Sequence, residues 1–146
     1  MATVTAYNSG LLTLTNGGTA FATDACYAIL VNGYEFVDTH TAYSNVSAAE
    51  LDPEDNDYDR VVLGNKSVTV VTGTPSKIVY NCDNISFGDP VSIGPADGIV
   101  ILKGTAATPQ AADALLFYAP LDPAVTSTAA AFSINTTNGL YEISIA

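Results

Sequence analysis

The chain has 146 residues, of which 48% are hydrophobic and 13% charged, and its formal net charge is −11. This length suits one domain with a sizeable core. With four basic residues the chain cannot form the basic stripe that neutralises phosphates, so we expect no binding to nucleic acid or to an anionic membrane. No apolar run reaches the roughly 18 residues of a membrane span. The start, MATVTAYNSG, lacks the basic and apolar regions of a signal peptide.

The first half of the chain predicts short strands, with one helical segment. Two strands are expected on either side of Asn8-Ser9-Gly10. The uninterrupted apolar run Cys26 to Val31 is typical of a central strand buried on both faces. His40 to Leu51 is the one segment with near-helical spacing of apolar residues, and the helix would end before Pro53.

The second half predicts strands throughout. The alternating, β-branched run SVTVVT favours a strand, and GIVILK and ALLFY are buried runs, the latter stopped by Pro120 and Pro123. Asn138-Gly139 lies between two alternating runs, which predicts a hairpin of residues 132–134 with 140–145. The predicted strands are 4–7, 11–14, 26–31, 68–71, 77–80, 85–87, 98–103, 114–118, 132–134 and 140–145.

About nine or ten closely spaced strands with one short inserted helix predict an all-β fold. We expect an antiparallel β-sandwich or flattened barrel that forms a single domain over residues 1–146. A share of charged residues roughly half the usual one also indicates that part of the surface is covered by a partner.

The acidic stretch DPEDNDYD, residues 52–59, raises the question of a calcium site. Three alternate residues match the first ligand positions of an EF-hand loop: Asp55, Asp57 and Asp59. Arg60 then stands where the loop needs glycine, and Lys66 where it needs a bidentate glutamate, so the EF-hand pattern fails. The stretch is interpreted as a solvated loop, where packed like charges repel least. An irregular calcium loop remains the alternative.

No set of catalytic residues is evident. His40 is the single histidine, it has no nucleophile motif around it, and we expect a half-exposed loop or helix-entry residue. One histidine and two cysteines are too few for a structural zinc site. A glycosidase pair would draw on glutamates: Glu35, Glu50, Glu54 or Glu142, of which the last is expected to point outward. We therefore expect no enzyme, no cofactor and no metal.

Cysteines and tyrosines leave two alternatives open. Cys26 and Cys82 lie among apolar and aromatic neighbours and are expected to be buried reduced thiols, with a disulfide as the second possibility. Five tyrosines could line a flat binding face, or each could lie half in the core and half at its rim. These are Tyr7, Tyr34, Tyr43, Tyr58 and Tyr141.

The order of several motifs resembles a group of small virion proteins of tailed bacteriophages. TVTAYNSGLLTLTNG, YAILV and HTAYSNVSAAEL come first. SVTVVT, DNISF, SIGPADGIVIL, LLFYAPL and FSINTTNGLYEISIA follow, so the resemblance runs over nearly the whole chain. Each motif is weak by itself, and SIGPA followed by an apolar strand is the most specific. The acidic composition of residues 52–59 departs from the Gly-rich loop of this group.

The resemblance implies a capsid decoration (cement) protein located on the virion. Such proteins often form trimers and bind the major capsid protein or other virion proteins, which reinforces the shell. The resemblance supplies no catalytic residue, and contacts are expected at sheet edges and termini, with residues 2–7 as an extended arm. The alternatives are a tail, neck or fibre module of the virion, or a calcium-dependent carbohydrate-binding module.

Overall fold

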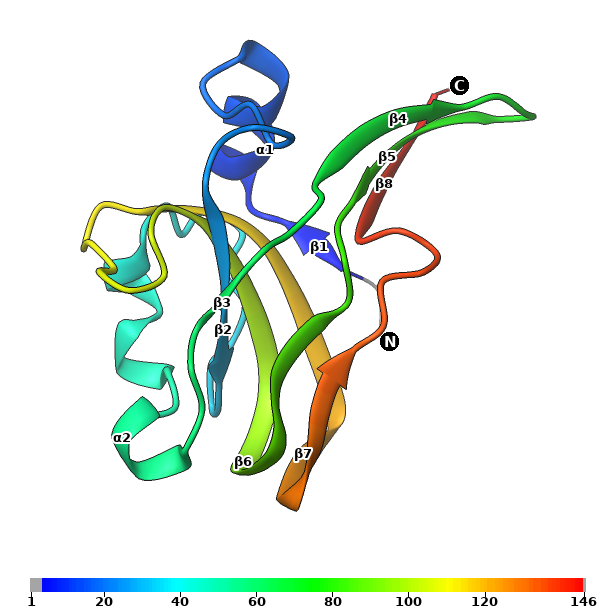
Figure 1. The fold of residues 1–146 in the computed structure, drawn as a ribbon. Coiled ribbons are helices and arrows are strands. Elements are labelled where there is room, and N and C mark those ends of the chain that lie inside the picture. The colour runs from blue at the N-terminus through cyan, green and yellow to red at the C-terminus, as the bar shows by residue number, and fades with distance from the viewer. Residues whose placement is uncertain (1–3, 146) are drawn as a thin grey trace.

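The computed structural model describes residues 4–145, without the side chains of residues 55, 56 and 145. Two antiparallel sheets, of five and three strands, form the structure, with the orders β1-β7-β6-β2-β3 and β4-β5-β8 (Figure 1). The strands are β1 (Thr5–Ala6), β2 (Cys26–Val31), β3 (Val61–Val62), β4 (Ser67–Val71), β5 (Ser76–Asn81), β6 (Ile85–Lys103), β7 (Ala114–Ile134) and β8 (Tyr141–Ile145). The predicted all-β, sandwich-like fold is confirmed.

A long two-stranded ribbon of β6 and β7 forms the centre of the fold. The two strands pair from Lys103 opposite Ala114 to Ile85 opposite Ile134, and the register shifts repeatedly along the way. Bulges of this kind bend a strand pair, and Figure 1 shows both strands turning back at the lower end of the view. The prediction that Pro120 and Pro123 stop the strand is wrong, because β7 continues through an irregular stretch where a missing N–H is tolerated.

The central strand β2 of the five-stranded sheet is buried on both faces. Alternate residues of β2 point to opposite faces, so Cys26, Ala28 and Leu30 enter one core cluster, while Tyr27, Ile29 and Val31 enter another. The first core cluster lies between the sheet and the returning half of the ribbon, from which it takes Val91, Ile93 and Phe132. The second core cluster is covered by Tyr34, Phe36, Tyr43, Val46 and Ala49. The prediction of a strand buried on both faces is thereby confirmed.

Helix α1 (Asn8–Asn16) forms where a strand over residues 11–14 was predicted, and that prediction is wrong. Gly10 is buried against the backbone of β7, and Leu14 packs on the first core cluster. Thr13 donates a hydrogen bond to the Gly10 carbonyl within the helix. Tertiary packing therefore overrides the alternating pattern of LLTLT.

The predicted helix from His40 to Leu51 is replaced by two single 3₁₀ turns, Tyr43–Asn45 and Ser47–Ala49. The backbone of this segment bonds to the end of the sheet: Tyr43 N–H donates to the Asp113 carbonyl and Ser44 N–H to that of Ala111. The Asn45 side chain accepts from the N–H groups of residues 41 and 42. Such local side-chain bonds compete with a regular helix.

Asn138-Gly139 forms a turn, but not the predicted hairpin. Gly139 has a φ of +94° and its N–H donates to the Thr136 carbonyl. The strands on either side belong to different sheets, because β7 pairs with β6 and β8 pairs with β5. The chain leaves one layer and joins the other at this turn.

The expected N-terminal arm lies partly within the protein's own fold. Residues 2 and 3 fall outside the described part of the chain. Thr5 and Ala6 pair with β7, and Tyr7 is fully buried. Residues 4–7 therefore do not form a free arm.

Gly10→Ala is expected to destabilise the protein. A Cβ at this position would lie 2.3 Å from the Leu115 carbonyl oxygen and 2.8 Å from the Leu116 Cα, and backbone cannot move aside easily. Overpacking of this kind typically lowers the free energy of unfolding by about 1–3 kcal/mol, although alanine is the better helix former. Urea unfolding measures the change. Gly73→Ala is the control, because the nearest atom is 3.5 Å away. An unchanged stability of the Gly10 variant would contradict the packing described.

Candidate interaction surface

The three strands β4, β5 and β8 form an arm that extends away from the body of the protein (Figure 1). We call these strands, residues 67–71, 76–81 and 141–145, the arm. β5 lies in the middle, so β4 and β8 are both edge strands of this sheet. An edge strand presents a row of unpaired backbone N–H and C=O groups, which can pair with another chain.

One face of the arm is apolar along its whole length. In antiparallel pairs, opposite residues project to the same face, and the pairing places six apolar side chains in two rows across the sheet. These rows are Val68–Tyr80–Tyr141 and Val70–Ile78–Ile143, which we call the arm face. The tyrosines and isoleucines reach the first core cluster, whereas Val68 and Val70 are 43% and 65% exposed. The core therefore continues outward as an exposed apolar surface.

The arm carries little charge in an acidic chain. Its Lys77 and Glu142 form an exposed ion pair at 3.0 Å on the opposite face, where Glu142 points outward as predicted. The surrounding sequence, residues 60–82, holds three of the four bases and no acidic residue. Sequence analysis predicted the strands of the arm but missed their exposure. The absence of acidic residues from positions 60–82 is the sequence signal that could have indicated the exposure of the arm.

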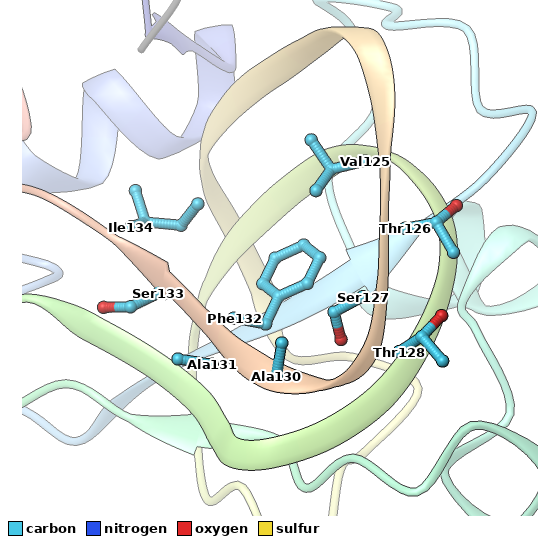
Figure 2. A pocket seen from close by; sticks show the side chains of 9 residues that line it. All are labelled: Val125, Thr126, Ser127, Thr128, Ala130, Ala131, Phe132, Ser133 and Ile134. Atoms are coloured by element: carbon cyan, nitrogen blue, oxygen red, sulfur yellow. The ribbon is translucent and has the colours of Figure 1, made fainter.

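A second surface of low charge lies on the returning half of the ribbon. Residues 125–128 and 130–134 of β7 line a hollow of about 290 Å³. Figure 2 shows the Phe132 ring within the curl of the strand, with Val125, Ser127 and Ala130 on the same side and Thr126 and Thr128 projecting away from the ring. Ser127 donates a hydrogen bond of 2.6 Å to the Val91 carbonyl, which fixes β7 on β6. We call the lining residues the ribbon face. It holds no charged side chain and no pair of catalytic groups.

Glu50 is a buried carboxylate with a full set of hydrogen-bond donors. It accepts from the hydroxyls of Tyr43 and Tyr58 at 2.6 and 2.9 Å, and from two nitrogens of Arg60 at 2.7 and 2.9 Å. Its side chain is 5% exposed. Burial raises the pKa of both tyrosines, and the neighbouring Glu50 adds to the effect. Because every oxygen is occupied, Glu50 fixes the 43–60 segment and is unsuited to proton transfer.

The other candidate catalytic residues lie apart. His40 is half-buried in a turn, as expected, and its Nδ1 lies 2.9 Å from the hydroxyl of Tyr34. Glu35 and Glu54 are exposed, and neither is among the hydrogen-bond partners of His40. No nucleophile and base converge on these residues in the described part of the chain.

The acidic stretch is more ordered than the predicted loop. Helix α2 (Pro53–Asn56) follows Asp52, whose carboxylate accepts from the Glu54 N–H. Tyr58 is buried in the first core cluster, so the loop prediction is wrong for these two parts. The described residues include no group of three or more His, Cys, Asp or Glu side chains placed to hold a metal ion. The side chain of Asp55 lies outside that description.

The tyrosines and cysteines are parts of the core. Tyr7 and Tyr58 are buried in different clusters, so the five tyrosines named above do not share a flat face. Cys26 and Cys82 are free and buried, which confirms the predicted reduced thiols. Burial raises the pKa of each thiol to about 11.

Comparison of the chain with protein-family models, curated proteins and solved structures finds no match to any of the three. Among the described residues, no helix has the length and apolar character needed to cross a membrane. The arm face and the ribbon face are therefore the features from which a function has to be argued.

Arg60→Met is expected to lower the free energy of unfolding by about 3 kcal/mol, because it leaves a buried carboxylate without its cation. Chemical denaturation measures this loss. The matched control is the double variant Glu50→Gln with Arg60→Met, which removes the stranded charge and should recover part of the stability. A single variant as stable as the parent would contradict the role assigned to Glu50.

The two thiols are expected to be unreactive in the folded protein. With a pKa of about 11, each thiol is almost entirely protonated at pH 8, and burial blocks access. Titration with a thiol reagent at pH 8 should label neither cysteine in the native state and both in denaturant. Absence of labelling in denaturant would indicate a disulfide, and rapid native labelling would contradict the burial described.

Proposed function

We propose that this protein is a structural component of a virion, a decoration protein that binds the outside of a capsid shell. The observation that carries the proposal is an exposed apolar, charge-poor surface on an otherwise acidic chain. Large exposed apolar patches mark protein interaction sites. The arm face supplies such a patch, with Val70 65% exposed. Such a patch favours a protein-binding role, and the resemblance in motif order favours virion proteins as partners, with the major capsid protein bound by the ribbon face.

The charge supports a place on the outside of the shell. A net charge of −11 is repelled by packaged nucleic acid. The outer surface of a shell imposes no such repulsion. The low charge of the arm face and of the ribbon face lets the protein approach a protein surface without desolvating charged side chains.

The mechanism is binding without a reaction. A stable protein contact buries about 800 Å² on each partner, and a homotrimer on a lattice would make several such contacts at once. The copies then bind more tightly together than any one copy does alone. The ribbon face is the surface we assign to the shell, because its lining residues carry no charge and most of them are exposed. The hydrogen bonds of Glu50 to Tyr43 and Arg60 and of His40 to Tyr34 are structural contacts, and the proposal assigns these residues no chemical role.

The test is saturation binding of the purified chain to shells that lack it. We expect binding to saturate at hundreds of copies per shell. Saturation at about six or twelve copies would instead favour a ring in the neck or tail. Failure to bind shells, tails or fibres would overturn the proposal.

A variant pair locates the contact on the shell. Thr128→Lys places a charge on the ribbon face and is expected to weaken shell binding at least tenfold. Leu12→Lys is the matched control, because Leu12 is exposed on helix α1, away from the ribbon face. Equal binding by both variants would contradict the assignment of the ribbon face.

A further inference from the structure

The arm has two free edges of equal length. β4 (Ser67–Val71) and β8 (Tyr141–Ile145) each pair with β5 on one side, and no strand of the described residues pairs with the other side of either. Proteins usually protect such edges with lysine, proline or a bulge. β4 contains only Ser, Thr and Val and pairs with β5 without a register shift. Its edge is therefore open to another strand.

The arm is the surface at which a second copy of this chain meets the least electrostatic repulsion. Two copies that each carry −11 repel one another over most orientations. At the arm the repulsion is smallest, because the charges of Lys77 and Glu142 cancel within 3.0 Å. Of the three bases in residues 60–82, Arg60 and Lys77 form ion pairs within the chain, so Lys66 is the one left to attract an acidic neighbour.

We propose that copies of this protein join through the arm, with β4 of one copy pairing against β8 of the next. The contact satisfies both free edges, whereas a contact between two β4 strands would leave both β8 edges open. It also extends the arm face across the junction, because the exposed Val68 and Val70 of one copy meet the rows that end in Tyr141 and Ile143 of its neighbour.

This contact gives a ring when the rotation between copies closes, and an open filament when it does not. β4 and β8 are both antiparallel to β5, so they run parallel to each other within one arm. Rotation about an axis along the strands preserves their direction, and the β4–β8 pair between copies is then parallel. A contact between two different surfaces closes only as a ring. Three copies give a ring of nine strands, in agreement with the homotrimer in the proposed function, which this inference deepens.

The first experiment compares oligomer mass by sedimentation velocity. The parent is expected to sediment as a closed oligomer, more completely at high salt, which screens the repulsion between acidic bodies. Val70→Lys is expected to raise the dissociation constant of the oligomer at least tenfold, so that the variant sediments mainly as a monomer. Leu12→Lys is the control, since Leu12 and Val70 are 61% and 65% exposed. A monomeric parent, or equal association of both variants, would overturn the proposal.

The second experiment identifies the paired edges and does not depend on the folding of Val70→Lys. Thr69 and Ser144 are exposed, and the native thiols are buried, so cysteines introduced there react selectively with a short bismaleimide. Crosslinks between chains are expected for the double variant Thr69→Cys with Ser144→Cys. Each single variant should stay uncrosslinked. Crosslinking by Thr69→Cys alone would show a two-fold β4 contact and overturn the β4–β8 pairing.

The shell-binding proposal and the arm-contact proposal can each be overturned without the other. A chain that forms the ring but binds no shell would overturn the proposed function and leave the arm contact intact. A chain that binds shells as a monomer would overturn the arm contact alone.

Discussion

The pairing of β6 with β7 is the constraint on which the rest of the structure depends. These two strands remain paired while the bulges between them bend the ribbon back over the sheet that its other half helps to form. One ribbon therefore supplies both the sheet and much of the layer that covers it. This arrangement buries Ile99 and Ile101 against Val91 and Ile93 in the first core cluster. Burial of apolar area at about 25 cal/mol per Å² is the main stabilising term in such a core.

The same constraint places the arm outside the body. β5 enters the core at Tyr80, and farther out the valines of its partner β4 are exposed, without a covering layer from the described residues. The core apolar rows thus continue to Val70, which is more than half exposed. An edge strand with exposed valines can pair with another chain, and an exposed apolar patch marks an interaction site. The exposure of this sheet is the structural reason for assigning a binding role to the protein.

The sequence predicted the elements whose pattern is set locally. The run Cys26 to Val31 has apolar residues on both faces, and the structure buries both of its faces. It did not predict elements decided by distant contacts. Gly10 packs on the backbone of β7. This segment forms a helix, although its apolar and polar residues alternate as they do in a strand. The turn at Gly139 was evident, but the partner of β8 is β5, more than 60 positions earlier in the chain. The arm face was missed because alternation does not reveal whether a second layer covers a strand.

The proposed role is adhesion, through a body built on the β6–β7 ribbon, an apolar arm and an acidic exterior. The central claim is that the protein lies on the outer surface of the capsid shell. A reconstruction of the particle that carries this chain tests that claim most directly. The account predicts many copies on the outer surface of the shell, with neighbouring arms in contact and the ribbon face toward the shell. Density for the chain inside the particle against nucleic acid, or no density for it at all, would contradict the account.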